Sequence, residues 1–134
     1  MRTKISLQTV RGEFVNRIET ISGQSLLACN QCGKCSAGCP VAFSMDVIPN
    51  QVIRMAQLGI EDVLQVQTIW TCAACLTCVS RCPKGIDLPR VMEALRQLYM
   101  EKYGNMLNPD QIAPEQAAEM PQLAIIGGFR KYSV

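Results

Sequence analysis

The chain reads Cys29-Asn-Gln-Cys-Gly-Lys-Cys-Ser-Ala-Gly-Cys-Pro40 in one place and Cys72-Ala-Ala-Cys-Leu-Thr-Cys-Val-Ser-Arg-Cys-Pro83 in another. Both stretches have the spacing Cys-x2-Cys-x2-Cys-x3-Cys-Pro, and the second follows the first after 43 residues (72 − 29). All 8 cysteines of the 134-residue chain belong to these two runs. A repeat that uses every thiol indicates two related metal-binding loops in one domain.

This spacing is typical of loops that hold cubane iron–sulfur clusters. Three thiolates at intervals of three residues can reach three iron corners of one cube, whereas the fourth cysteine follows a turn and points away. In two-cluster ferredoxins that fourth cysteine binds the other cluster. On the pattern of those proteins, two [4Fe-4S] clusters are predicted. Cluster 1 would be bound by Cys29, Cys32, Cys35 and Cys82, and cluster 2 by Cys72, Cys75, Cys78 and Cys39.

Zinc and disulfides are the two alternatives that eight cysteines raise. Zinc ribbons use two paired cysteines in each half, not three followed by Cys-Pro, so the spacing favours iron–sulfur clusters. A secreted disulfide scaffold would be expected to carry a leader, and Met1–Val10 contains charges but no apolar stretch of that kind. Both alternatives are therefore much weaker than the cluster interpretation.

Composition narrows the class of protein. Aromatic residues make up 5%, and no apolar run is long enough to span a bilayer, so we expect a soluble chain with no direct membrane span. Because cubane clusters are oxygen-sensitive and assembled inside cells, the expected location is cytoplasmic. The formal charge is +2, and two oxidised clusters would add about −4 to give about −2. No basic tract suggests nucleic acid as a partner.

Three basic residues, Lys34, Arg81 and Lys84, lie inside or beside the runs. They either raise a cluster's potential or are simply solvated surface charges. The chain has 0 histidines, which excludes imidazole acid–base catalysis, and it contains no G-x-G-x-x-G or P-loop. The residues thus predict an electron carrier with no substrate-turnover site of its own.

The segment between the two runs is predicted to be helical, which makes the fold mainly α. Pro49 suits the first turn of a helix and Gly59 suits the position after its end. Its inward face comprises Ile48, Val52, Met55 and Ala56. A second, shorter helix is predicted over Glu61–Thr68, with Ile60, Val63 and Leu64 inward. Trp70 is predicted to be a core anchor beside a cluster.

Two longer amphipathic helices are predicted to flank the runs. Arg11–Ser22 would be closed by Gly23 and would bury Phe14, Val15, Ile18 and Ile21. The other would be capped by Asp87 and run to Tyr103, followed by Gly104. Its predicted inward residues are Leu88, Val91, Met92, Leu95, Leu98 and Tyr99, and its predicted solvent face is Arg90, Glu93, Arg96, Gln97 and Glu101.

The ends of the chain are predicted to differ from its middle. We expect a single domain with an N-terminal segment (1–24), a two-cluster core (25–108) and an extended, partner-docking tail (109–134). Thr3–Val10 alternates weakly and is a candidate strand for pairing with another chain. The apolar patch Leu123–Ile126 would be unusual on a monomer's surface, so docking on a partner is favoured over loose order.

Beyond the cysteine spacing, the residues between the cysteines resemble a particular family. The first run, the segment Pro49-Asn-Gln-Val-Ile-Arg-Met-Ala-Gln-Leu-Gly59 and the approach Ile69-Trp-Thr-Cys72 are similar to HdrC, the small iron–sulfur subunit of heterodisulfide reductase. The resemblance covers about Cys29–Tyr103 and leaves both termini outside. It implies the fold of an α-helical ferredoxin with two CxxCxxCxxxCP cluster loops.

The resemblance also implies partners and a role. In that family, the small subunit lies between a flavin-bearing, iron–sulfur subunit (HdrA) and a catalytic subunit (HdrB), in assemblies that carry out flavin-based electron bifurcation. Electrons cross the two cubanes to HdrB, where clusters bound by CCG motifs reduce the disulfide of coenzyme M and coenzyme B. This chain contains no CCG triplet. It is thus expected to be the electron-transfer subunit of an oxidoreductase complex, with HdrA-like and HdrB-like partners.

Three other interpretations stay open at this point. The iron–sulfur subunits of succinate, fumarate, glycolate and glycerol-3-phosphate dehydrogenases share the same pair of cysteine runs. They usually add a ferredoxin domain or CCG repeats, which are absent here. A freely diffusing ferredoxin and a non-enzymatic iron–sulfur redox sensor are the remaining alternatives.

Overall fold

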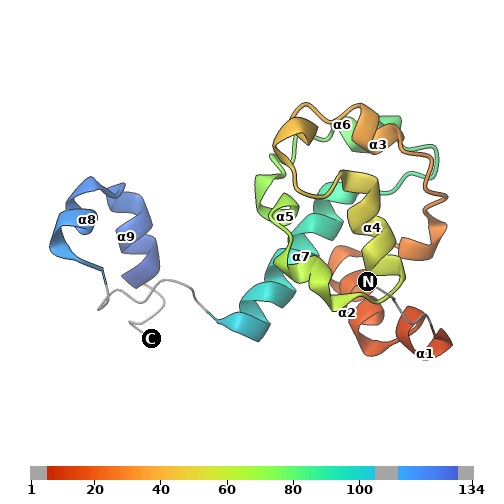
Figure 1. Ribbon diagram of the computed structural model, residues 1–134, viewed down its shortest axis with the longest axis horizontal. Helices are drawn as coiled ribbons and strands as arrows, with labels where there is room; N and C mark the ends of the chain where they lie inside the picture. Colours follow the sequence, from red (N-terminus) through yellow and green to blue (C-terminus); the bar gives the residue numbers. More distant parts are fainter. Residues whose placement is uncertain (1–5, 105–111, 130–134) are drawn as a thin grey trace. The chain divides into compact units, whose positions relative to one another are not determined.

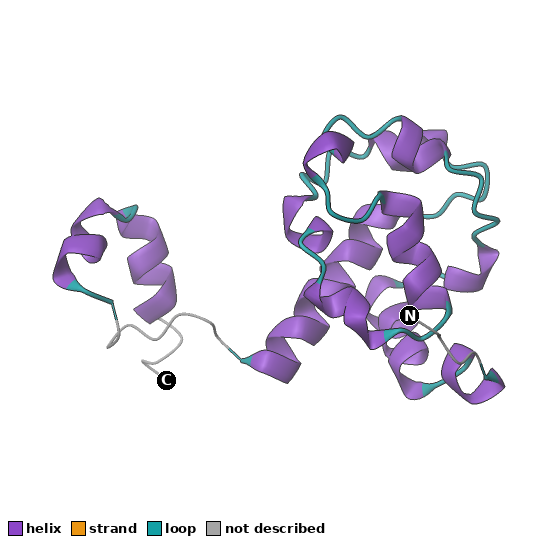
Figure 2. Cartoon of the chain, in the orientation of Figure 1, coloured by secondary structure: helices purple, strands orange, loops and turns teal. Residues whose placement is uncertain are grey.

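The computed structural model describes residues 6–104 and 112–129, and within these ranges every regular element is a helix (Figure 1, Figure 2). The predicted mainly α class is confirmed. The chain divides into two compact units, Met1–Lys102 and Tyr103–Val134. The first unit contains α1 (Leu7–Val10), α2 (Glu13–Ser22), the 3-10 helix η1 (Leu26–Ala28), α3 (Lys34–Ala37), η2 (Ala42–Ser44), α4 (Pro49–Gln57), η3 (Glu61–Gln65), α5 (Thr68–Thr71), α6 (Thr77–Arg81) and most of α7 (Leu88–Tyr103).

The core of the first unit lies where α2, α4 and α7 meet η1 and η3 (Figure 1). These helices bury the apolar stripes that the 3.6-residue period places on one side of each. Residues with 0% exposure come from each of the five elements: Ile18, Leu26, Val52, Ala56, Val63, Val91, Met92, Ala94 and Leu95. The result is an apolar base on which the cysteine-containing loops rest.

Helix α2 confirms the predicted segment, with two adjustments. Val15 and Ile18 are buried, Phe14 is partly buried against the core, and Gly23 ends the helix in the left-handed conformation. Ile21, predicted inward, is 37% exposed. Ser22 is buried in its place and donates a hydrogen bond to the Ile18 carbonyl at 2.6 Å.

Helix α4 begins at Pro49 and is followed by Gly59, as predicted. Gly59 has φ +68°, and a Cβ atom there would clash with the carbonyl oxygen of Thr9. Glycine is therefore needed for both its backbone conformation and the close approach of the N-terminal segment. Ile48 was predicted inward but is 39% exposed, whereas Ile53 is buried at 2%.

Two local predictions were wrong. Thr3–Val10 is not a strand where it is described: residues 1–5 lie outside the described residues, and Leu7–Val10 forms a helical turn. Ser6 caps this turn and Thr9 reciprocates, so short-range capping outweighs the weak alternation. The helix predicted over 61–68 is broken by extended backbone at Val66, which leaves the short 3-10 helix η3 and then α5.

Helix α7 runs from Leu88 to Tyr103, and Asp87 Oδ1 accepts a hydrogen bond from the Arg90 amide at 3.2 Å. One residue of its predicted solvent face differs. The Arg96 side chain is only 19% exposed, and its Nη1 donates to the Ile69 carbonyl at 2.8 Å. Arg96 thereby ties α7 to the helical turn that precedes the second cysteine run.

Trp70 is not the buried anchor that was predicted. It is 48% exposed and packs edge-on against Tyr99, with ring centroids 5.6 Å apart and an interplanar angle of 83°. Its neighbour Ile69, at 0% exposure, fills the core position instead. Thr68 and Ile69, both at 0% exposure, take the inward positions of α5, and Trp70 follows on its outer side.

The second unit contains α8 (Pro114–Glu119) and α9 (Gln122–Phe129). Pro114 occupies the first turn of α8, where a missing N–H costs nothing. The described part of the tail is therefore helical and not extended. Leu123 and Ile126 on α9 are 84% and 54% exposed, so the predicted apolar patch is at the surface of this unit. Across residues 6–104 and 112–129, no helix has both the length and the apolar character needed to cross a bilayer.

Candidate functional site

The two cysteine runs fold into loops with the same backbone path. Gln31 and Ala74, which are equivalent under the 43-residue repeat, have φ of 57° and 50°. Gly33 and Leu76, also equivalent, have φ of 76° and 63°. Each loop then enters a short helix, α3 or α6, and these two helices pack against each other (Figure 1). The sequence repeat is thus a structural repeat.

This path is strained, which points to function. A left-handed conformation costs a residue other than glycine about 1 kcal/mol or more, and Gln31, Ala74 and Leu76 all adopt it. Residues that alternate between right- and left-handed backbone turn neighbouring N–H groups toward one side. The resulting concave surface is the arrangement in which protein backbones bind anions and iron–sulfur centres.

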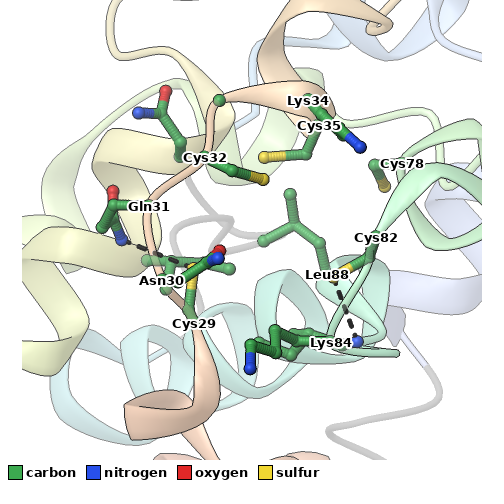
Figure 3. A pocket seen from close by; sticks show the side chains of 14 residues that line it. Cys29, Asn30, Gln31, Cys32, Lys34, Cys35, Cys78, Cys82, Lys84 and Leu88 are labelled. Atoms are coloured by element: carbon green, nitrogen blue, oxygen red, sulfur yellow. Dashed lines mark hydrogen bonds between the residues drawn. The ribbon is translucent and has the colours of Figure 1, made fainter.

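The first loop surrounds a small cavity (Figure 3). Five thiols line it, four of which were predicted as one ligand set: Cys29, Cys32, Cys35, Cys82 and, in addition, Cys78. In Figure 3 the Leu88 side chain lies among these cysteines. Its other lining residues include Asn30, Gln31, Lys34, Asn50 and Lys84 beside Ile53, Ile86 and Leu88, and the surface that they present to the cavity is almost entirely apolar.

The second loop surrounds a similar small cavity. Its five thiols are Cys72, Cys75, Cys78, Cys39 and, in addition, Cys35. Apart from these thiols, the lining is apolar: Val41, Met45, Pro49, Ala73, Ala74, Leu88, Pro89 and Met92. The two cavities therefore have equivalent sulfur sets but different walls.

Each cavity is lined by two cysteines of the other run, the third and the fourth. Cys82 lines the first cavity and Cys39 lines the second. Cys35, Cys78 and Leu88 line both, so the two cavities adjoin along these side chains. Soft sulfur ligands in apolar surroundings are the donor set that iron–sulfur clusters use. The residues present fit two such clusters.

The electrostatics of the thiols depend on their burial. Burial raises the pKa of Cys35, and burial together with the nearby Cys72 thiol raises the pKa of Cys78 to about 11. A hydrogen bond with the Thr77 hydroxyl, 3.4 Å from Cys75 Sγ, lowers the pKa of the exposed Cys75. Bound iron supplies the positive charge that buried thiolates need. In the described part of the chain, no three cysteine or carboxylate side chains converge closely enough to hold one isolated metal ion.

A glutamine pair beside the first cavity was not predicted. Gln31 Nε2 lies 3.6 Å from Cys29 Sγ and 3.4 Å from Gln57 Oε1 (Figure 3 shows the contact with sulfur). Gln57 is 4% exposed and donates to the carbonyls of Leu26 and Cys29. The sequence signal for this pair was a polar residue, Gln57, on the inward face of α4. The apolar residues on the same face obscured it.

The predicted basic residues take different positions. Lys34 and Lys84 line the first cavity. Arg81 lines neither cavity and lies against Gly38, where a Cβ atom would be 2.7 Å from Arg81 Cδ. Glycine at 38 therefore makes room for this side chain.

Asp46 is a second residue that sequence reasoning missed. Its carboxylate accepts hydrogen bonds from the amides of Val47, Gln67 and Thr68 at 2.8–2.9 Å and from the Thr68 hydroxyl at 2.6 Å. Desolvation is the largest single effect and opposes the charge, but the four hydrogen bonds together outweigh it and hold the pKa of Asp46 below its ordinary value. Asp46 thus fixes the segment after the first run to the N-terminus of α5, which leads directly into Cys72.

Comparisons with known proteins agree with this geometry. A family model described as a 4Fe-4S dicluster domain matches residues 25–86. The C2 subunit of an H2/formate:CoB-CoM heterodisulfide, ferredoxin reductase from Methanococcus maripaludis is 39% identical over 88 residues, which are 66% of this chain and 47% of the relative. A C-type iron–sulfur subunit of the CoB–CoM heterodisulfide reductase from Methanocaldococcus jannaschii is 34% identical over 110 residues, 76% of this chain and 59% of the relative.

A third relative, the C-type subunit of a ferredoxin:CoB-CoM heterodisulfide reductase from Methanosarcina mazei, is 33% identical over 90 residues, 67% of this chain and 56% of the relative. The chain spans about half the length of these curated relatives, between 47% and 59%. The matched residues include both cysteine runs. The chain therefore contains a 4Fe-4S dicluster domain that carries two [4Fe-4S] clusters, and it is homologous to the iron–sulfur C subunits of heterodisulfide reductases.

Proposed function

We propose that this chain is the electron-transfer subunit of a heterodisulfide reductase-type complex. In this role it relays electrons from a flavin-bearing, iron–sulfur partner of the HdrA type to a catalytic, CCG-motif partner of the HdrB type. The names of the relatives support the type of complex. The observation that carries the relay is that two thiol-lined cavities adjoin, with Cys35, Cys78 and Leu88 lining both. Adjoining sites allow an electron to pass between clusters inside one small protein.

The ligand sets that we propose follow the crossed arrangement. Cluster 1 would be held by Cys29, Cys32, Cys35 and Cys82, and cluster 2 by Cys72, Cys75, Cys78 and Cys39. The presence of Cys82 in the first cavity and Cys39 in the second supports this exchange. Cys35 and Cys78 line both cavities, and their positions in the repeat assign them to their own loops.

When bound, each cluster supplies reversible one-electron chemistry. The chain itself has three tasks. Its thiolates hold the iron, and the apolar base formed by α4 and α7 keeps water away from the cavities. The side chains around each sulfur set how strongly added negative charge is stabilised. Substrate turnover is assigned to a partner, because the two thiol-lined cavities are otherwise lined by apolar, amide and lysine side chains, without a carboxylate or imidazole for acid–base work.

We assign partner docking to α9. Leu123 and Ile126 are exposed apolar residues on a helix that belongs to a unit separate from the cluster core. Exposed apolar patches of this kind mark interaction surfaces. The cytoplasmic location expected for oxygen-sensitive clusters stays a prediction.

Two matched variants test the ligand sets. Cys39→Ala should destroy the cluster anchored by Cys72, Cys75 and Cys78, and Cys82→Ala should destroy the other one. Each purified, anaerobically reconstituted variant should lose about half of its iron and sulfide, and EPR of the reduced proteins should show that the two variants lose different signals. If both variants lose the same signal, or if each loses the cluster of its own run, the crossed assignment is wrong.

The complex from the native host tests the relay. This chain should co-elute at high salt with a flavoprotein and a CCG-motif protein, and stopped-flow mixing should show its clusters reduced and reoxidised within one turnover. Leu123→Ser should weaken the complex without changing iron content. Leu7→Ser is a matched control, because Leu7 is 82% exposed and Leu123 is 84% exposed. A chain that elutes alone, or clusters that stay oxidised during turnover, would exclude the relay.

A further inference from the structure

The two cavities differ in the hydrogen bonds that reach their sulfur atoms. In the first cavity the Gln31 carboxamide lies 3.6 Å from Cys29 Sγ (Figure 3), and the Ile86 amide lies 3.3 Å from Cys82 Sγ. In the second, the Thr77 hydroxyl lies 3.4 Å from Cys75 Sγ, and the Thr77 backbone also hydrogen-bonds to that sulfur, but no side-chain amide reaches it in the described residues. Donors that point at sulfur favour the reduced, more negative state of a cluster and so raise its potential.

The orientation of the Gln31 amide is determined by Gln57. Both N–H groups of Gln57 Nε2 are used, on the carbonyls of Leu26 (2.7 Å) and Cys29 (3.0 Å). Gln57 Oε1 must therefore face the other way, where it accepts from Arg54 Nη1 at 3.3 Å and from Gln31 Nε2 at 3.4 Å. Gln31 consequently presents its NH2 group, not its oxygen, to this side, and its second N–H is directed at Cys29 Sγ.

This network has no counterpart in the other loop. The residue equivalent to Gln31 under the 43-residue repeat is Ala74, which has no side-chain donor. Both residues adopt a positive φ, so the backbone of the loop does not require a glutamine at this position. The long side chain instead connects a buried amide and a surface guanidinium to one sulfur. Hydrogen-bonded chains of this kind polarise each member and strengthen the last bond.

The charged residues around the first cavity also favour a higher reduction potential for its cluster. Lys34 and Lys84 line the first cavity together with Asn30 and Asn50. The second cavity is lined by apolar side chains apart from its thiols. The positive charges of Lys34 and Lys84 stabilise the extra electron of a reduced cluster beside them, and solvent screens this effect in part because both residues are exposed.

We propose that the cluster bound through Cys29 has the higher reduction potential of the two, and that Gln31, oriented by Gln57, is a positioning residue that raises it. An electron entering this chain from any external reductant then resides mainly on the Cys29 cluster. This inference rests on the proposed binding of one cluster by Cys29, Cys32 and Cys35. The contribution of the Ile86 amide rests in addition on Cys82 as the fourth ligand, whereas the contribution of Gln31 does not, and no partner protein is involved.

The test is an EPR-monitored redox titration of the reconstituted full-length chain, with dithionite as the reductant. The two signals are assigned with Cys32→Ala and Cys75→Ala, which remove one ligand of the first run and one ligand of the second. Gln31→Ala, which copies the second loop, should weaken reduction of the Cys29 cluster about tenfold, or 59 mV for one electron, and leave the other potential unchanged. Thr77→Val, the matched control, should lower only the potential of the Cys75 cluster.

A second variant covers the case in which Gln31→Ala fails to assemble its cluster. Gln57→Leu keeps Gln31 but removes the acceptor that orients it, and it should lower the same potential by a smaller amount. The inference is overturned if the Cys29 cluster is the lower-potential one, or if neither glutamine variant changes its potential. Because no partner is present, either result leaves the proposed relay untouched, and loss of the native complex would leave this inference untouched.

Discussion

Replacing Asp46 by alanine is expected to destabilise the junction between the two cysteine runs. The carboxylate accepts four hydrogen bonds, from the amides of Val47, Gln67 and Thr68 and from the Thr68 hydroxyl. Thr68 is 0% exposed, so its hydroxyl would have to rely on the Val47 carbonyl, 2.6 Å away. The variant thus removes the cap of α5, the turn that delivers Cys72 to its cavity.

The magnitude follows from the contacts. Loss of a helix cap costs about 1 kcal/mol, and a hydrogen bond to a charged group adds about 1.5 kcal/mol before solvent screening. Because the Asp46 side chain is exposed, screening reduces the total, and about 1.5 kcal/mol remains. For a core of this size that corresponds to a fall of roughly 6–12 °C in the thermal midpoint. Asp46→Asn keeps one acceptor oxygen and should lose about half as much.

The assay is thermal unfolding of the cluster-loaded protein followed by circular dichroism, at one fixed scan rate because cluster loss is irreversible. Asp62→Asn, which removes an exposed carboxylate on η3, is the control and should leave the midpoint unchanged. The hydrogen bonds lower the pKa of Asp46 in the folded state, so its contribution is present above the ordinary carboxyl pKa and is lost only as the pH falls through the lowered value. The deficit of Asp46→Asn should therefore be constant from about pH 8 to about pH 5. A midpoint for Asp46→Ala equal to that of the wild type would refute the reasoning.

Three further predictions concern the backbone and the core. Gly59→Ala should cost about 3 kcal/mol, because its Cβ would clash with the Thr9 carbonyl, whereas Gly23→Ala, with an equally positive φ and open space, should cost about 1 kcal/mol; equal losses in denaturant unfolding would argue against the packing at Thr9. Leu76→Gly should raise stability by about 0.5 kcal/mol, since Leu76 is 56% exposed and held at φ 63°; a lower thermal midpoint would contradict this. Met92→Ala should cost about 3 kcal/mol and hasten iron release from the second cavity, which Met92 lines; chelator kinetics that show equal acceleration at both clusters would exclude a local effect.

The parts of the fold that the sequence predicted are those governed by local rules. Pro49 and Gly59 delimit α4, and the apolar period of α2 and α7 identifies most of the core. Cysteine spacing placed all eight thiols in two loops, because loop geometry and ligand spacing are both short-range properties. The helices of the tail were not predicted. Two such short helices need only a proline at the first turn and a few favourable residues, and the composition of the segment does not reveal them.

The wrong predictions for Trp70 and Arg96 and the failure to notice Gln57 and Asp46 have a common physical cause. Each residue is placed by a partner far away in the sequence: Trp70 by Tyr99, Arg96 by the Ile69 carbonyl, and Gln57 by carbonyls about 30 residues earlier. Hydropathy averages over one segment and cannot register a single long-range hydrogen bond. Such bonds surround the candidate site, so the ligands were predictable while the side chains that tune and fix them were not.

Leu88 lines both cavities and is 3% exposed, at the first residue of the longest helix in the described chain. The distance between the two cofactors is thus determined in part by one aliphatic side chain at the start of a long helix. Tunnelling rates fall exponentially with the gap that an electron crosses. The first residue of α7 therefore acts as a spacer. A smaller or larger residue at position 88 would change the rate of electron transfer between the two clusters without changing any iron ligand.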